Sequence, residues 1–482
     1  MRRILRIAAE EMRLMSRTRT AWLGLIALVL LSSIAAATSL AHVAGERAAR
    51  MEHQTAADQA FEAQPDRHPH RAVHYGTYVQ RPVSPLAAFE PGVDPFTGTT
   101  LFLEGHRQNS ATFGAMRESS GLIRFGQLTP AFVLQTLAPL LLIFLGFSTV
   151  ARDRETGVFR QLGLHGARAA EVLAGKALAL GTVGLIALAP ALVSLATAAA
   201  TTPAEMASAA LIGGAYAVYL AIWVLVVVAV SSLARSSRGA LLGLVAVWAV
   251  AVVLVPRGAA AIAAQAEPAP TRVEMDLLLA QDARRIGDSH NPDDPFFAAF
   301  RVRTLRAYGV ERVEDLPVNF RGLVAAEGEA LTARLFADYA RRTADRQRAQ
   351  SAWLQAGAML SPALAVRQAS MAGAATDLEN HIRFLEQAEA YRFDLVQRLN
   401  RLHAQGVRAE DDAARSRDLD AERRTRVSAD TWATLPDFQF RSATPGQRVS
   451  GMLPGLAILA GWLLAAIGLF VFAGRQLRQV AG

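Results

Sequence analysis

The chain has 482 residues, of which 52% are hydrophobic and only 19% are charged. This composition indicates a membrane protein and not a soluble protein of several domains. Cysteine is absent, which excludes disulfides, Cys-ligated zinc, iron–sulfur clusters and thiol catalysis. The formal net charge of +8 comes from arginines spread along the chain, so no basic patch for nucleic acid is visible.

Six segments are apolar and long enough, at roughly 20 residues each, to cross a hydrocarbon core about 30 Å thick. They are residues 21–41, 128–150, 177–200, 208–233, 240–256 and 452–473. None contains Asp, Glu, Lys, Arg or His, which argues against a proton- or sodium-coupled carrier. We therefore predict an all-α integral membrane protein with six transmembrane helices.

The short connections between these segments predict the orientation. Basic residues precede the first span, lie between the second and third and between the fourth and fifth, and follow the sixth. The connection from Thr201 to Ala207 has none. By the positive-inside rule, both termini are cytoplasmic and the long connections 42–127 and 257–450 are external.

Residues 1–20 precede the first span and show a helical period. One face carries apolar residues and another carries charged ones: Ile4, Ala8, Met12 and Met15 against Arg6, Glu10, Arg13 and Arg17. This pattern predicts an amphipathic helix in the cytoplasmic interface, with a basic tail as the simpler alternative. A signal peptide is disfavoured because the segment before the span is long and includes acidic residues.

The two long connections differ in pattern. Segment 42–127 has many prolines, glycines and short polar runs, which predict irregular loops with short helices and some strands. Segment 257–450 carries apolar residues at helical spacing, at Leu331, Leu335 and Tyr339 and again from Leu378 to Leu402. It predicts a domain of antiparallel long helices, and 451–482 returns as the sixth span and a cytoplasmic tail.

The first long connection holds six of the ten histidines: His42, His53, His68, His70, His74 and His106. His68 and His70, with His74 nearby, could bind a divalent metal through their imidazoles. No carboxylate or thiol follows at a firm spacing, so exposed loop residues are the preferred interpretation. The sequence therefore assigns no metal ligand and no cofactor to the chain.

No enzymatic motif is present. The single lysine lies in Ala174-Gly175-Lys176-Ala177, which is not a phosphate-binding P-loop, so any ATP and Mg²⁺ must be bound by another polypeptide. The Gly-x-Ser-x-Gly and His-Glu-x-x-His signatures are absent as well. We expect the chain itself to be non-catalytic.

The segment 151–176 between the second and third spans is the most informative. It begins with Arg152-Asp153-Arg154-Glu155, continues through Gly157, Phe159, Arg160 and Leu162, and closes with Gly175-Lys176. On its residues alone it is either a docking element for a soluble partner or a solvated loop. The pattern resembles permease subunits of ABC-2 type exporters, although Val158-Phe159 stands where that family more often has Thr-Leu. The resemblance implies a coupling helix that contacts the ATPase through Arg154, Glu155, Gly157, Phe159, Arg160 and Leu162.

The likeness extends over nearly the whole chain. It includes Tyr75-Gly76-Thr77-Tyr78-Val79, Pro82 to Leu86, Pro91 to Pro95, Glu104 to Asn109, Leu128-Thr129-Pro130, Tyr308-Gly309-Val310, Asp315 to Phe320 and Leu435 to Phe438. These stretches resemble a bacterial ABC-2 permease subfamily with a large external domain of unknown function.

That resemblance implies a multi-pass protein of the bacterial inner membrane. Its implied partners are a cytoplasmic ATP-binding cassette ATPase, an identical or sibling permease and the bilayer, with a periplasmic protein as a further candidate and no nucleic acid. The function expected is the permease subunit of an exporter driven by that ATPase. The alternative is a mechanotransmission complex, in which ATPase motion acts on a periplasmic partner without transport.

Overall fold

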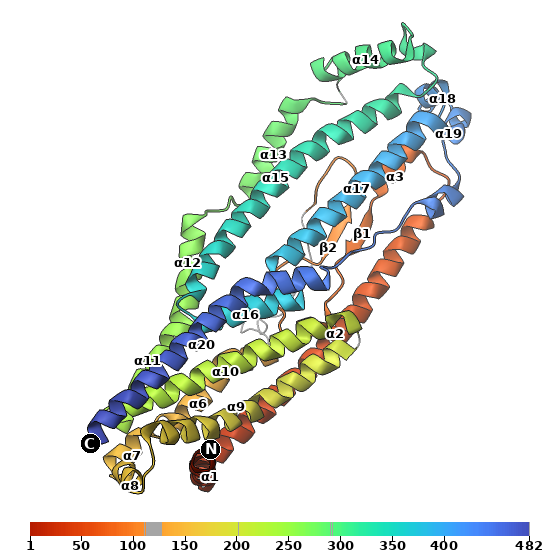
Figure 1. Ribbon diagram of the computed structural model, residues 1–482. Coiled ribbons are helices and arrows are strands. Elements are labelled where there is room, and N and C mark those ends of the chain that lie inside the picture. The colour runs from red at the N-terminus through yellow and green to blue at the C-terminus, as the bar shows by residue number, and fades with distance from the viewer. Residues whose placement is uncertain (110, 112–127, 201, 290, 292, 482) are drawn as a thin grey trace.

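The computed structural model describes residues 1–109, 111, 128–200, 202–289, 291 and 293–481. Long helices form an elongated molecule with both termini at one end (Figure 1). We call this the terminal end of the helix bundle, and we call the part beyond the opposite end of the bundle the distal domain. The six predicted spans are confirmed as helices long and apolar enough to cross a membrane, at Ala21–Glu62, Pro130–Glu155, Ala169–Ala200, Pro203–Leu233, Ser237–Ala266 and Pro445–Leu477.

The bundle is built around α10, whose aromatic side chains Tyr216, Tyr219 and Trp223 are buried. Its elements are α2 (Arg19–Glu62), α5 (Pro130–Phe132), η3 (Val133–Leu137), α6 (Ala138–Gly146), α9 (Ala169–Ala200), η4 (Pro203–Glu205), α10 (Met206–Leu233), α11 (Ser237–Trp248), η5 (Ala249–Leu254), α12 (Val255–Ala266) and α20 (Pro445–Ala481). Elements η3 and η5 are π-helical turns. Side chains of neighbouring helices donate hydrogen bonds to two backbone carbonyls of η3. The Tyr219 hydroxyl donates to the carbonyl of Gln135 at 2.7 Å, and the Trp248 indole donates to the carbonyl of Thr136 at 3.1 Å.

The predicted N-terminal helix is present as α1 (Arg2–Arg17). It packs closely on α9, because a Cβ atom placed on Gly175 would lie 2.7 Å from the Cβ of Ile7. The buried face contains Ala8 and also Glu11. This segment is therefore a packed helix of the bundle and not a loose basic tail.

Helix α2 continues 21 residues beyond the predicted end of the first span at residue 41, to Glu62. Loops were predicted there, but residues 46–62 are mostly strong helix formers and the next proline is Pro65. The short elements predicted after it are present as α3 (Pro69–Tyr75), β1 (Thr77–Gln80), η1 (Pro85–Ala88) and β2 (Thr100–Leu103). The strands pair antiparallel, with Thr77 opposite Leu103, while the 112–127 part of the predicted domain lies outside the described residues.

Helix α16 (Pro362–Ala374) differs from the prediction that all of 257–450 stands outside the bundle. It packs against α10 and α20, where a Cβ on Gly455 would lie 3.0 Å from the Cβ of Ala369. The Ser361 hydroxyl before it donates to the carbonyl of Ala251 in the fifth span at 2.5 Å. Small residues permit this close packing. The sequence does not indicate a span here, because the helix is short and carries Arg367 on its exposed side.

The distal domain contains the helices predicted for 257–450. They are α13 (Arg272–Ile286), α14 (Pro295–Tyr308), η6 (Val313–Asp315), α15 (Phe320–Ala358), α17 (Leu378–Gly406), α18 (Ala409–Ala414), α19 (Leu419–Arg424) and η7 (Ala429–Thr434). Helices α15 and α17 run antiparallel side by side (Figure 1). The predicted apolar stripe of α17 is core: Leu395 and Leu399 pack with Val73 of α3 and with Trp432. The two long connections thus share one core.

A buried ion pair joins these two helices. Arg392 Nη1 of α17 lies 2.6 Å from Glu329 Oε1 of α15, and both side chains are almost fully buried. Burial alone would raise the pKa of Glu329, but hydrogen bonds from His106 and the charge of Arg392 outweigh burial and lower the pKa to about 2. Glu329 is therefore a carboxylate at neutral pH.

Candidate functional site

The connection between the second and third spans projects from the terminal end as two short helices (Figure 1). These are α7 (Ala151–Glu155) and α8 (Val158–Leu164). Gly157 joins them with a φ of 78°, a left-handed conformation that favours glycine. Gly166 adopts a φ of 77° just after α8, so a glycine stands at the turn on each side of α8.

Arg154 and Glu155 hold this projection against the connection between the fourth and fifth spans. Arg154 Nη1 donates to the carbonyls of Ser232 at 2.6 Å and Ala234 at 3.0 Å, at the end of α10. Glu155 accepts from the amide and hydroxyl of Ser237 at 2.8 and 2.7 Å, at the start of α11. Both residues were predicted to contact a partner, and the structure gives each of them a bracing role within the chain.

The apolar residues of α8 are divided between two environments. Phe159 and Leu162, which the resemblance places at the ATPase contact, are half-buried, and Phe159 packs against the main core of the bundle. Gly157 and Arg160 are exposed. Leu164 at the end of α8 is 82% exposed, so it is the most exposed apolar side chain of the projection. Sequence reasoning missed Leu164 because it lies off the Phe159–Leu162 stripe.

A buried charge network fixes the base of the projection. Lys176 Nζ of α9 lies 2.8 Å from Glu11 Oε2 of α1 and 2.8 Å from Asp153 Oδ2 of α7. The Thr149 hydroxyl donates to the second carboxylate oxygen of Glu11 at 2.5 Å. The Lys176 side chain is only 4% exposed, and these two carboxylates are placed to balance its buried charge. In the sequence, Lys176 stands out as a lysine without a P-loop and as the end of the 151–176 pattern, and neither feature predicts this charge network.

Helix α1 also contacts the far end of the projection. The Arg3 guanidinium donates to the carbonyl of Gly166, after α8, and lies 3.9 Å from Glu171 at the start of α9. Helix α1 therefore contacts the projection at its base and at its far end. Hydrogen bonds and ion pairs thus connect the α7–α8 projection to α1, α9, α10 and α11.

Two family models match residues of this chain. Residues 5–305 match the family described as ABC-2 family transporter protein, and residues 273–441 match a domain of unknown function (DUF3526). No match was found among curated proteins. The first of the two family matches covers well over half of the 482 residues and includes most of α1, all of the α7–α8 projection and five of the six spans. The chain therefore belongs to the ABC-2 family of transporter proteins, as a multi-pass membrane component that carries a further domain of unknown function.

Proposed function

We propose that this chain is the permease subunit of an ATP-binding cassette exporter, and that α8 is the helix that docks into a separate ATPase subunit. The observation that carries the proposal is the exposure of Leu164 on a projection fixed by Lys176. An exposed leucine on a rigid, charged support is suited to fill a pocket in a soluble partner. ATP and Mg²⁺ belong to that partner, because Lys176 has no P-loop around it.

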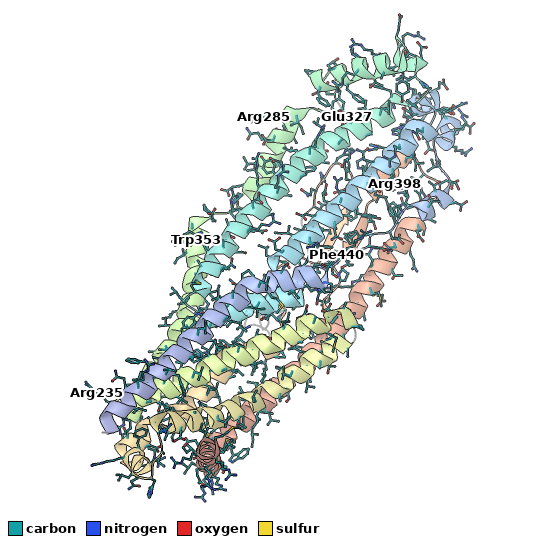
Figure 2. All side chains as sticks on the ribbon, viewed as in Figure 1. Arg235, Arg285, Glu327, Trp353, Arg398 and Phe440 are labelled. Atoms are coloured by element: carbon teal, nitrogen blue, oxygen red, sulfur yellow. The ribbon has the colours of Figure 1, made fainter. Side chains whose placement is uncertain are left out.

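The orientation we propose has the terminal end in the cytoplasm. Both termini, α7 and α8 lie at this end, as does the labelled Arg235 (Figure 2). The short basic connections are all here, and the positive-inside rule assigns them to the cytoplasm. The distal domain then faces the opposite side, which in the bacterial inner membrane is the periplasm.

We also propose that two permease chains pair in the membrane. The fifth and sixth spans present many exposed apolar side chains, including Leu242, Val250, Leu254, Leu453, Leu464 and Phe472. Such a surface is stable against lipid or against a second apolar helix face. A pair, identical or sibling, would place two α8 helices on two ATPase subunits.

Export is favoured by a groove at the outer end of the first span. It has a volume of about 640 Å³ and lies along α2, lined by residues that include Ser39, Glu46, Arg50 and Asp94. Apolar and charged side chains meet there, so cargo leaving the bundle would find both kinds of contact. The groove lies between the first span and the distal domain, which fits a receiving role for that domain.

Mechanotransmission is the second candidate, and the length of α2 favours it. This one helix has 44 residues, about 66 Å, and passes unbroken from the terminal end into the distal domain. Helix α16 adds a second rigid link, because it packs on α10 and α20 and is followed directly by α17. Motion in the bundle would therefore reach the distal domain directly.

The primary test is the composition and activity of the complex from its native membranes. The tagged chain should co-purify with an ATP-binding cassette ATPase, and the complex should hydrolyse Mg·ATP while the isolated chain does not. Turnover by the isolated chain, or a stable complex without any ATPase, would refute the proposal.

The two candidates can be separated by spin labels at Glu52→Cys and Arg398→Cys, both exposed in the distal domain. Mechanotransmission predicts a changed distance between the labels when Mg·ATP is trapped in the complex. An unchanged distance would contradict it and leave export.

A further inference from the structure

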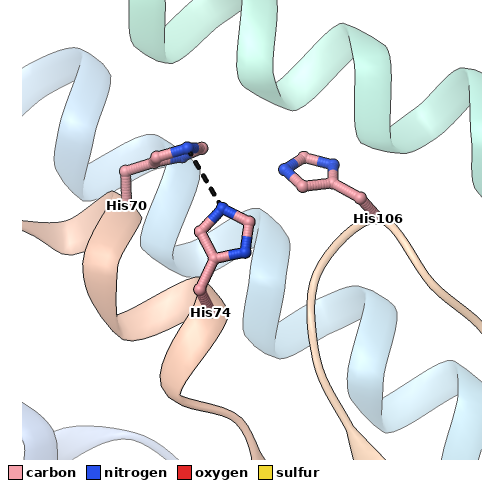
Figure 3. Close-up of side chains that lie close together, drawn as sticks. All are labelled: His70, His74 and His106. Atoms are coloured by element: carbon pink, nitrogen blue, oxygen red, sulfur yellow. Dashed lines mark hydrogen bonds between the residues drawn. The ribbon is translucent and has the colours of Figure 1, made fainter.

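Three histidines from two separate segments meet in the distal domain. His70 and His74 stand one turn apart on α3, and His106 stands in the turn after β2 (Figure 3). The ring centroids lie 4.9 Å apart for His70 and His74, 5.4 Å for His74 and His106, and 5.9 Å for His70 and His106. One nitrogen from each ring falls within 4.8 Å of the other two. Sequence analysis preferred exposed loop residues here, but His70 and His106 are half-buried and His68 is buried.

We propose that His70, His74 and His106 form a binding site for a divalent transition-metal ion, with Zn²⁺ as the ion that suits it best. The Nε2 atoms of His70 and His74 are 3.3 Å apart. Two nitrogens that ligate a tetrahedral Zn²⁺ at about 2.0–2.1 Å lie roughly 3.3–3.4 Å from each other, so this pair already has the spacing of two ligands. Figure 3 shows a ring nitrogen of His106 turned toward the pair. The three ligand nitrogens lie within 4.8 Å of one another, and three imidazoles leave the fourth position of a tetrahedral ion to water.

The ring of His106 is oriented by a buried carboxylate. His106 Nδ1 lies 3.3 Å from Glu329 Oε2, and the backbone amide of His106 donates to the same oxygen at 3.0 Å. Arg392 binds the other oxygen of Glu329, so the carboxylate is fixed. A metal-ligating histidine typically presents one ring nitrogen to the ion and the other to such a carboxylate. The Glu329–His106 pair has this arrangement, with the remaining nitrogen on the side of His70 and His74.

The backbone at His106 is held in an uncommon conformation. His106 has a φ of 65°, a left-handed value that is infrequent for residues other than glycine. This conformation costs energy and persists only where surrounding contacts compensate for it. Gly105 imposes it: its amide donates to the carbonyl of Val73 in α3 at 3.0 Å, and a Cβ there would lie 2.1 Å from Val73 Cγ1. The turn is thereby pressed onto α3, which sets His106 opposite His70 and His74.

A second histidine group lies beside this site, and its contacts explain it without a metal. His68 Nε2 lies 3.3 Å and His403 Nε2 2.9 Å from the two oxygens of Asp412. Asn319 and Arg415 bind the same carboxylate at 3.0 and 3.2 Å. Four neighbours therefore surround the Asp412 carboxylate, and these contacts within the chain make the group a structural support. It also positions the proposed site, because His68 is the N-cap of α3. Its Nδ1 atom accepts a hydrogen bond from the backbone amide of His70.

The proposed ion would join α3 and the β2 turn directly, and α15 through Glu329. His74 and His106 are 32 residues apart in sequence, and His106 and Glu329 are 223 residues apart. The ion would therefore fasten the first long connection to the second. The inference does not depend on the proposed transport function.

The test measures Zn²⁺ binding to the full chain purified in detergent without a histidine tag. Equilibrium dialysis against Zn²⁺ at micromolar free concentration gives the stoichiometry, and the visible spectrum of bound Co²⁺ reports tetrahedral coordination. Because the chain has no cysteine, thiol ligands cannot contribute. We expect one ion per chain and a tetrahedral Co²⁺ spectrum.

His74→Ala is the main variant, because His74 is exposed and its loss leaves the fold intact. We expect at least a 100-fold loss of affinity for His74→Ala, and a 10- to 100-fold loss for Glu329→Gln. The matched control is His42→Ala with His53→Ala, two exposed histidines on α2, which should bind as the wild type does.

Absence of binding at micromolar Zn²⁺, retention of full binding by His74→Ala, or an equal loss in the His42–His53 control would each overturn the site.

Discussion

Lys176 donates a hydrogen bond to Glu11 over 2.8 Å inside the terminal end of the bundle. The contact links the third span to a helix that precedes the first span, across 165 residues of sequence. Lys176 also reaches Asp153 at the base of the α7–α8 projection. The N-terminal helix, the projection and the third span therefore share one buried charge, so a displacement of one of them must disturb the other two.

Replacing Lys176 with methionine should destabilise the chain strongly. The change leaves the buried carboxylate of Glu11 and the half-buried carboxylate of Asp153 without a counter-charge. Breaking a buried ion pair in this way typically costs about 3–5 kcal/mol. The thermal midpoint of the purified chain should fall, whereas the exposed neighbour Glu10→Gln should leave it unchanged. Adding Glu11→Gln and Asp153→Asn to Lys176→Met should restore part of the loss. If Lys176→Met has the same thermal midpoint as Glu10→Gln, the charge network does not contribute to stability.

Leu164→Ala should weaken ATPase binding and leave the fold intact. The side chain is exposed, so its truncation removes no packing within the chain, while the loss of an interface anchor costs about 2 kcal/mol. Phe159→Ala with Leu162→Ala should lower both thermal stability and ATPase binding, because Phe159 also packs on the core. Arg160→Gln should change the amount of co-purified ATPase little, since exposed ion pairs contribute about 0–1 kcal/mol. Equal co-purification for Leu164→Ala and wild type would remove Leu164 from the interface.

Cysteine labelling tests the proposed orientation in a chain that has no cysteine of its own. Arg235→Cys lies at the terminal end and Arg398→Cys in the distal domain, and both positions are exposed (Figure 2). With the outer membrane permeabilised, an impermeant maleimide should label Arg398→Cys and should reach Arg235→Cys only after the inner membrane is opened. The reverse labelling pattern would show that the orientation is opposite to the one proposed.

The distal domain should lose stability as the pH falls through the range in which His381 is protonated in the unfolded chain. Burial, followed by the charge of Arg81, lowers the pKa of His381 to about 4. The unfolded chain, with an ordinary pKa of about 6.5, takes up a proton first, so stability is full above about pH 6.5 and falls toward pH 4 by up to about 1.4 kcal/mol per pH unit.

His381→Gln should remove this contribution to the pH dependence. The difference in thermal midpoint between about pH 7.5 and about pH 5 should be smaller in this variant than in the wild type, since the linked proton uptake is gone. The exposed His53→Gln should keep the wild-type difference. An unchanged difference in His381→Gln would show that His381 does not titrate as stated.

The six spans could be predicted because their signal is local: each is a long apolar run in the sequence. The same holds for α1, whose amphipathic period is visible within 17 residues. The apolar stripe of α17 likewise predicted a core helix, and Leu395 and Leu399 are buried as expected.

Features that depend on distant residues could not be predicted in this way. Helix α16 has Arg367 and Gln368 within a short alanine-rich segment, so its average hydropathy hides its place among the spans. Glu155 looks like a docking residue in sequence, and only the fold brings Ser237 to it, 82 residues later. His106 and Glu329 are separated by 223 residues, which is why the histidines of α3 lacked a visible partner.

The most direct test of the account is a cross-link from Leu164→Cys to the ATPase in native membranes. A benzophenone attached to this single cysteine should form, on illumination, a product that contains an ATP-binding cassette protein, and the yield should change when Mg·ATP is trapped. The same reagent on Arg398→Cys in the distal domain should give no such product. An intact, ATP-hydrolysing complex in which Leu164→Cys forms no cross-link to the ATPase would contradict the assignment of α8 as the coupling helix.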